Sequence, residues 1–258
     1  MGGYSVYYQS NAMYEYLNGN PDNRFFYVSS DMWMLVYGNQ KCEPLLLVLV
    51  SGVNDKDELS SVSEREGRAY KIMSELSEKS EVPLVFIRFS VNIATIDSVA
   101  LFDPKSSNFL RLDLRELRTL FSKCGLPVSN TPTAKYLNDK ESSAYHKWQR
   151  AELGHSLRVS DIDLVNIKNK EICKVYELKR SYYSLESWVP FTDDYHNFEL
   201  LSKLSHKAKL QLLIAYNKRT KNPWKDDISK IKLFEFNHAK SNPVTLKGYY
   251  TLKEFLDL

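Results

Sequence analysis

The chain has 258 residues, 43% of them hydrophobic, which is enough for the packed core of one large domain or two ordinary ones and excludes a chain disordered throughout. The formal net charge of +3 is too small to indicate a polyanion partner by itself. Its distribution is uneven: residues 1–128 carry 13 Lys and Arg against 16 Asp and Glu, and residues 129–258 carry 22 against 16. Phosphate contacts are therefore expected in the second half.

The three cysteines stand singly, without C-x-x-C spacing, so we expect reduced core residues and neither disulfides nor a zinc site. They are Cys42, Cys124 and Cys173. The N-terminus lacks a basic start followed by an apolar core, and no apolar run reaches the ~18 residues of a membrane span. These features predict a soluble, cytoplasmic protein without a membrane partner.

The chain contains a weak internal repeat. Residues 29–51, SSDMWMLVYGNQKCEPLLLVLVS, align without a gap with residues 159–181, VSDIDLVNIKNKEICKVYELKRS, at a shift of 130. Three further matches follow in the same order: 72–87 with 200–215, 98–103 with 230–236, and 114–121 with 252–258. Two tandem domains are therefore expected, residues 1–126 and 134–258, with a linker in the Gly-, Pro-, Ser- and Thr-rich stretch between them.

Each copy is expected to run helix, strand, strand, helix, strand, strand, helix. In the second copy, helix 141–153 should end at Gly154, and two strands joined by a polar turn at 166–171 should follow. Next come an amphipathic helix at 196–208, an apolar strand at 210–216, a strand at 230–236 and a final helix. This order predicts an α/β protein in which each domain is a mixed sheet of four to five strands flanked by helices.

Charged residues interrupt the first two strands of the second copy. Residues two apart on a strand share a face, so Asp161 should point the same way as Asp163, and Glu177 the same way as Lys179. Carboxylates gathered in a partly dry site need a compensating cation, and their hard oxygens favour Mg²⁺ or Mn²⁺. Such an ion activates water for attack on a phosphate, with Lys179 beside it. The expected reaction is phosphodiester hydrolysis, with Asp163, Glu177 and Lys179 as catalytic residues.

Asp163 followed on the next strand by Glu177-Leu178-Lys179 resembles the motif of the PD-(D/E)xK nuclease superfamily, which includes restriction endonucleases, Holliday-junction resolvases and repair nucleases. The resemblance covers about 110 residues of the second half. It implies a restriction-endonuclease-like fold and a metal held by Asp163 and Glu177. The proline of the motif is absent, because Ile162 stands before Asp163.

Two further metal ligands are implied by the same resemblance. Asp161 is a second or alternative ligand beside Asp163. Glu152 is the candidate for the helical glutamate that completes the metal site in many members of the superfamily, although it lies near the end of its helix.

The first copy lacks this chemistry. Under the shift of 130, the residues opposite Glu177, Lys179 and Asp163 are Leu47, Leu49 and Trp33, and only Asp31 keeps an acid, opposite Asp161. The first copy is therefore expected to be a catalytically inactive version of the same fold, with its apolar run LLLVLV as a buried central strand. Stiffening the active copy, forming a dimer interface and binding nucleic acid all remain open as its role.

Nucleic-acid contacts are expected from basic residues after the motif and from a basic loop at 217–225. They are Arg180, Ser181, Lys218, Arg219, Lys221, Trp224 and Lys225. The loop 182–198 is expected to lie over the cleft, with Trp188 and Tyr195 as candidate base contacts.

These features predict a Mg²⁺-dependent endonuclease acting on DNA. With one competent copy, a monomer should cut one strand, and double-strand cleavage should need two chains, as in a homodimer. An RNA nuclease and a non-catalytic nucleic-acid-binding or scaffold protein with a nuclease-like fold remain alternatives. In the second of these, the charges only protect an edge strand from aggregation or serve an interface.

Overall fold

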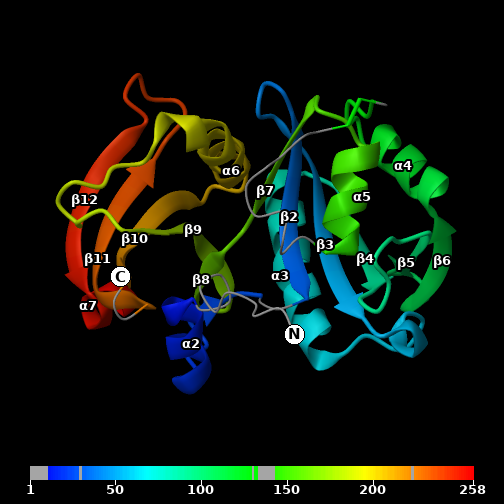
Figure 1. Cartoon of the computed structure of the whole chain (residues 1–258), viewed down its shortest axis with the longest axis horizontal. Helices are drawn as coiled ribbons and strands as arrows, with labels where there is room; N and C mark the ends of the chain where they lie inside the picture. The colour runs from blue at the N-terminus through cyan, green and yellow to red at the C-terminus, as the bar shows by residue number, and fades with distance from the viewer. Residues whose placement is uncertain (1–10, 29–30, 130, 133–142, 222–223) are drawn as a thin grey trace.

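A computed structural model of the chain describes residues 11–28, 31–129, 131–132, 143–221 and 224–258. It contains two six-stranded mixed sheets with helices on their faces (Figure 1). The expected mixed α/β class is confirmed, and each sheet has six strands where four or five were expected. No helix within the described ranges is long and apolar enough to cross a membrane.

The first sheet has the strand order β6-β5-β4-β3-β2-β7. Its strands are β2 (Met32–Asn39), β3 (Pro44–Val53), β4 (Leu84–Ser90), β5 (Ser98–Asp103), β6 (Asn108–Asp113) and β7 (Leu157–Asp161). The second sheet has the order β1-β8-β9-β10-β11-β12. Its strands are β1 (Phe25–Phe26), β8 (Leu164–Lys168), β9 (Glu171–Ser181), β10 (Gln211–Lys221), β11 (Trp224–Phe236) and β12 (Val244–Thr251).

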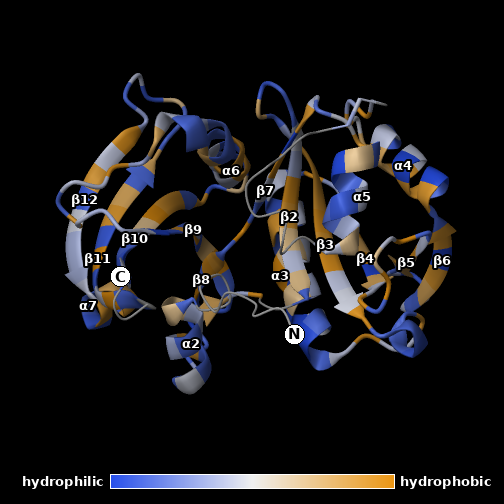
Figure 2. Cartoon of the chain, in the orientation of Figure 1, coloured by the Kyte–Doolittle hydropathy of each residue, from blue (hydrophilic) through white to orange (hydrophobic). Residues whose placement is uncertain are grey.

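The helices form layers on both faces of each sheet. They are α2 (Ala12–Gly19), α3 (Glu64–Ser80), α4 (Leu114–Lys123), α5 (Ala144–Glu152), α6 (Tyr195–Lys207) and α7 (Leu252–Leu256). Helices α3 and α6 lie between the two sheets and share one hydrophobic cluster with both of them. The outer face of the first sheet packs on α4 and α5, and that of the second sheet on α2 and α7. Figure 2 shows the hydrophobic residues concentrated along the central strands and the hydrophilic residues on the outer sides of α4 and α5.

The two halves have the same topology but exchange their first helix and strand. In each half, a strand pairs antiparallel with the next, the second and third are parallel across a helix, and two antiparallel strands follow. The edge strand beside this set comes from the other half: β7 pairs with β2, and β1 pairs with β8. The expected ranges 1–126 and 134–258 therefore each contribute strands to both sheets.

Local sequence signals account for most helix boundaries. Capping boxes begin α3 at Ser63, α4 at Asp113 and α7 at Thr251, each with a glutamate three residues later. Helix α5 ends before Gly154, whose φ of 85° fits the left-handed conformation expected after a helix. A Cβ at Gly154 would also lie 2.9 Å from the backbone oxygen of Ser129, so the position needs glycine for space as well.

Three strand expectations are corrected. Asp161 and Asp163 do not lie on one strand, because β7 ends at Asp161 in the first sheet and β8 begins after Asp163 in the second. The basic segment 217–225 is largely a hairpin and not a loop, since β10 and β11 extend into it. Strands β6 and β12 were not expected, because their exposed, mixed residues lack the apolar pattern of a central strand.

Candidate functional site

The candidate site forms where the chain crosses from the first sheet to the second. At the end of β7, Asp161 pairs with Leu35 of β2. The amide of Ile162 still donates to the carbonyl oxygen of Met34 at 2.8 Å, and the chain then leaves the first sheet. Asp163 directly precedes β8, so it lies at the end of the β8–β9 pair that is opposite the hairpin turn.

Asp163 is fixed by two hydrogen bonds. Its Oδ2 accepts the backbone N–H of Leu178 at 2.7 Å, which ties it to the middle of β9. Its backbone oxygen accepts the hydroxyl of Tyr14 at 2.8 Å. Because Tyr14 belongs to α2, an element of the first half holds an acid of the second.

Glu177 and Lys179 follow on the same face of β9, as expected from their spacing. The Lys179 Nζ lies 3.0 Å from Glu177 Oε1 and 3.6 Å from Asp194 Oδ2, just before α6. The ammonium group also lies 5.3 Å from the ring centroid of Phe198. Glu177 is 5% exposed, and its Oε2 is buried without a hydrogen-bond partner among the described residues. The site thus contains a buried carboxylate oxygen whose bonding capacity is unused.

The acids of this cluster are shifted toward their protonated forms. Burial raises the pKa of Glu177 to about 7, because the favourable charge of Lys179 does not outweigh desolvation and the charge of Asp161. Burial, together with the charges of Glu177 and Asp161, raises the pKa of Asp163 well above its usual range. Burial opposes the charge of Lys179, but Glu177 and Asp194 raise its pKa. The ammonium group therefore stays charged, and its single positive charge only partly compensates the carboxylates.

The donor set suits a hard cation with few protein ligands. Asp163 and Glu177 supply carboxylate oxygens, and one of these is the unpartnered buried Oε2. Across the described parts of the chain, no three His, Cys, Asp or Glu side chains are grouped so as to hold a metal ion. A site with two carboxylates and several waters fits Mg²⁺, which is commonly bound through one or two carboxylates. Asp161 is exposed at the end of β7 and influences both acids electrostatically.

Glu152 is not brought to this cluster. It is the exposed last residue of α5, and α5 covers the outer face of the first sheet through Tyr145 and Trp148. The exchange of first helices explains the displacement: the helix that covers the second sheet is α2. Glu152 therefore lies away from the cluster, and the expectation that it completes the site is wrong.

Among the expected nucleic-acid contacts, some side chains are engaged inside the protein. Arg219 is 6% exposed, with its Nε 2.7 Å from Asp226 Oδ1, and Arg180 bonds the other oxygen of the same carboxylate at 2.7 Å. Ser181 exchanges a hydrogen bond of 2.9 Å with the hydroxyl of Tyr216. The burial of Arg219 removes it from the surface residues that reach a phosphate backbone.

The exposed basic residues of the hairpin keep their expected place at the surface. Lys218, Lys221 and Lys225 are exposed, and Lys221 Nζ lies 4.7 Å from the ring centroid of Tyr182. Trp224 is the first residue of β11, and its side chain lies outside what the structure describes.

The two aromatic residues expected in the segment 182–198 differ in exposure. Trp188 is 3% exposed and stacks on Tyr216, with ring centroids 4.0 Å apart, so the expectation that it contacts a base is wrong. Tyr195 packs its ring against Phe236 at 5.4 Å but is only half-buried, and its contact with a base stays a prediction.

Two residues of the cluster were missed from the sequence. Asp194 had an available signal, since the shift of 128 places it opposite Glu66 of the first copy. The parallel registers support that shift for β3 and β9 as well: Leu47 pairs with Leu84, and Val175 with Leu212. Tyr14 had no such signal, because only the exchange of α2 brings it to Asp163.

The strand registers of the two halves give first-half counterparts of the motif residues that differ from those expected from sequence. The common shift of 128 places Glu177 opposite Leu49 and Lys179 opposite Ser51. The shift of 130 inferred from sequence is two residues too long for this strand. The first copy still lacks the motif, since leucine and serine replace the glutamate and lysine.

Comparisons with known proteins give no family for this chain. No family model matches it, and no curated protein matches it. Among solved structures, it is weakly similar to the C-terminal domain of the sex pheromone staph-cAM373 precursor from Staphylococcus aureus. That match has 8% identity and a TM-score of 0.16, and covers 84% of this chain and 70% of that chain. A likeness this weak carries no argument about fold or function.

Proposed function

We propose that this protein is a metal-dependent nuclease with a restriction-endonuclease-like fold in each half and a single active site in the second. The observation that carries the proposal is the pairing of Glu177 and Lys179 on one face of a buried strand beside Asp163. DNA is the proposed substrate, and the first half is proposed to be non-catalytic. Helix α6 joining the parallel strands β9 and β10 supports the fold assignment.

The side chains have distinct proposed roles. Asp163 and Glu177 hold the cation, since Glu177 is buried, Asp163 is half-buried, and Lys179 offsets their charge only in part. Lys179 stays protonated through Glu177 and Asp194, so it stabilises negative charge on the phosphate during cleavage. Bound Mg²⁺ or Mn²⁺ would supply the grip on the phosphate and lower the pKa of the attacking water.

A non-catalytic nucleic-acid-binding or scaffold role is the second candidate. It is favoured by the absence, in the described residues, of three metal-ligating side chains grouped around one point. In that case, the ion pair of Lys179 with Glu177 only neutralises charge on β9, and the site catalyses no reaction. The two functions differ in whether a divalent cation binds and whether phosphodiester bonds are cut.

The deciding experiment incubates the protein with supercoiled plasmid, linear duplex and single-stranded DNA, with Mg²⁺, Mn²⁺ or EDTA. The proposal expects cleavage only with the cation, and loss of at least ~100-fold in rate in Glu177→Gln and Lys179→Met. An RNA substrate in parallel separates the DNA and RNA assignments. Cleavage by both purified variants at the wild-type rate would rule out this active site.

Matched controls separate chemistry from general charge. Glu78→Gln and Lys71→Ala change exposed residues of α3 and should cleave like the wild type. Mg²⁺ should also raise the melting temperature of the wild type and not that of Glu177→Gln. A wild type that neither cleaves nor responds to the cation would favour the scaffold role.

A further inference from the structure

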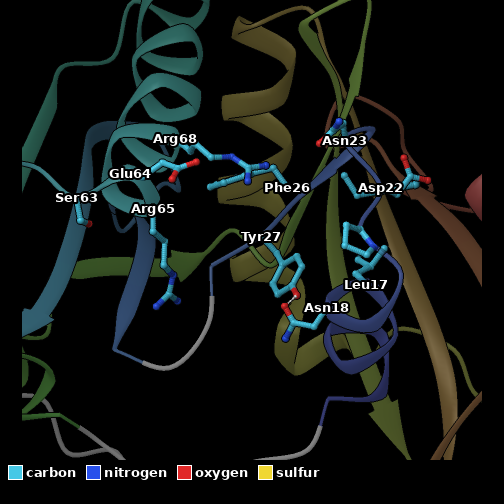
Figure 3. Close-up of a pocket in the computed structure, with 12 residues that line it drawn as sticks. Leu17, Asn18, Asp22, Asn23, Phe26, Tyr27, Ser63, Glu64, Arg65 and Arg68 are labelled. Carbon is cyan, nitrogen blue, oxygen red and sulfur yellow. Dashed lines mark hydrogen bonds between the residues drawn. The ribbon is translucent and has the colours of Figure 1, made fainter.

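A cavity of about 620 Å³ opens between α2 with β1 on one side and the first turns of α3 on the other (Figure 3). Its volume lies within the ~300–1,000 Å³ typical of small-molecule sites. The aromatic rings of Phe26 and Tyr27 line it, together with the exposed amide of Asn18. The side-chain oxygen of Asn18 accepts a hydrogen bond from the Tyr27 hydroxyl, so the cavity combines flat apolar surface with the remaining Nδ2 donor of this amide.

Two arginines of α3 extend across the opposite wall. Figure 3 shows Arg68 reaching from α3 toward Phe26 and Arg65 extending from α3 away from Phe26. The guanidinium carbon of Arg68 is 5.8 Å from the ring centroid of Phe26. Burial raises the pKa of Tyr27, and the charge of Arg65 opposes that rise, which places this guanidinium within electrostatic reach of the Tyr27 hydroxyl.

The charged residues of the cavity walls balance in number, because Asp22 and Glu64 match Arg65 and Arg68. The carboxylate of Asp22 is paired at 2.7 Å with the guanidinium of Arg24, which does not line the cavity. Glu64 is exposed in the first turn of α3. Positive charge at the cavity therefore comes from the two arginines of α3, without a net excess over the acidic residues of the walls.

The cavity adjoins the candidate site through one pair of stacked rings. Tyr27 stacks on Tyr14 with centroids 4.4 Å apart and planes 3° from parallel. The hydroxyl of Tyr14 in turn donates to the backbone oxygen of Asp163. A ligand against Tyr27 would thus lie two side chains away from the carboxylates.

We propose that this cavity binds one unpaired nucleotide of the strand that enters the candidate site, an inference that rests on the proposed nuclease function. The base stacks against the aromatic wall, where every base offers a π face. The Nδ2 amide group of Asn18 donates to the base edge, and Arg65 and Arg68 contact the adjoining phosphates. The substrate is accordingly a nucleic acid with a single-stranded segment beside the cleavage point.

The test measures binding in EDTA, so that cleavage plays no part. A fluorescein-labelled single-stranded oligodeoxynucleotide and a blunt duplex of the same sequence are titrated by anisotropy at several salt concentrations. The wild type should bind the single strand more tightly. Arg65→Ala/Arg68→Ala should bind it about tenfold more weakly, with a salt slope lower by about 1 to 2.

A control and a second readout fix the location. Lys123→Ala/Lys253→Ala removes two exposed lysines from α4 and α7 and should leave affinity within about twofold. An oligonucleotide carrying 5-iododeoxyuridine should photocross-link to Tyr27 or Phe26, as identified by mass spectrometry.

Each other outcome overturns the cavity proposal. These are no binding by the wild type at ~100 µM, equal affinity in the arginine variant, equal or greater loss in the lysine control, or cross-links confined to other segments. Failure of the proposed function is distinguishable, because it is decided by cleavage in Glu177→Gln with Mg²⁺. Binding in EDTA with intact cross-links would stand even if no cleavage occurred.

Discussion

In the first half, the buried carboxylate of Glu66 is fully paired, whereas in the second half one oxygen of the buried Glu177 has no partner within the described ranges of the chain. The guanidinium of Arg88 meets Glu66 through two bonds, of 2.8 and 2.6 Å. The same guanidinium donates to the carbonyl oxygen of Ser60 at 2.7 Å and covers the ring of Phe109 at 3.8 Å. The buried charge of Glu66 is therefore neutralised by Arg88 within the first half.

These two acids do not occupy equivalent positions, because Glu66 lies on helix α3 and Glu177 on strand β9. Under the common shift of 128, Glu66 corresponds to Asp194, and Arg88 corresponds to Tyr216, which pairs in register with Lys179. The half with the closed ion pair has no motif, and the half with the motif has no arginine at this place. The difference teaches that the fold does not require a buried acid at the position of Glu177, because the same topology places Leu49 there in the first half.

The pKa values express the same contrast. Burial alone would raise the pKa of Glu66, but hydrogen bonds from Arg88 and Ser63 lower it to about 2. Burial raises that of Glu177 to about 7 against the pull of Lys179. One carboxylate is stabilised in its charged form, and the other in its protonated form.

The largest expected effect comes from breaking the closed pair. Arg88→Met leaves Glu66 buried and unpaired, which should cost ~3–5 kcal/mol of unfolding free energy. Glu66→Gln/Arg88→Met should recover most of this loss, because glutamine keeps the cap at Ser63 and carries no charge. Urea unfolding at pH 7 measures both. A loss under ~1 kcal/mol in the single variant would contradict a buried ion pair between Arg88 and Glu66.

The second prediction is that a rise in pH changes the free energy of unfolding in opposite directions through Glu177 and through Glu66. The folded pKa of Glu177 lies above the ordinary value of 4.5, so stability is highest below pH 4.5 and falls as pH rises through about 7. A rise from 4.5 to about 7 corresponds to an upper bound of ~3 kcal/mol lost at high pH. For Glu66 the stabilisation is present above pH 4.5 and is lost as pH falls through about 2.

Glu177→Gln tests this directly by urea unfolding at pH 4 and pH 8. The variant should match the wild type at pH 4, below the ordinary pKa of 4.5, and be more stable at pH 8, because it no longer buries a charge there. The stability of Glu177→Gln should still fall somewhat as pH rises, since the pKa of Asp163 is also raised. The exposed Glu78→Gln should follow the wild type at both pH values. Equal stability of Glu177→Gln and wild type at pH 8 would contradict the raised pKa.

Much of this arrangement could be predicted from local sequence. The spacing of Glu177 and Lys179 fixed their shared face once β9 was expected, and the apolar LLLVLV run predicted the buried β3. Helix α6 followed from the amphipathic pattern of residues 196–208.

The exchange between the halves could not be predicted. Phe25–Phe26 is a two-residue edge strand, and either sheet would accept it by composition alone. Its partner β8 is selected by tertiary contacts, among them the packing of Met13 and Leu17 on the outer face of the second sheet. The misplacement of Glu152 and the omission of Tyr14 both follow from this one event.

The smallest expected effect tests whether the exchanged helix matters to the site beyond its packing. Tyr14→Phe removes one hydrogen bond to Asp163 and should cost ~1 kcal/mol of stability. If that bond positions Asp163, kcat should fall about fivefold with KM unchanged, the rate equivalent of ~1 kcal/mol. Tyr145→Phe is the matched control, because its buried hydroxyl bonds Tyr37 at 2.8 Å on the outer face of the first sheet. It should lose similar stability and keep wild-type kcat. Equal kinetics in the two variants would show that α2 serves the second half by packing alone, whereas a loss confined to Tyr14→Phe would make the active site a joint product of both halves.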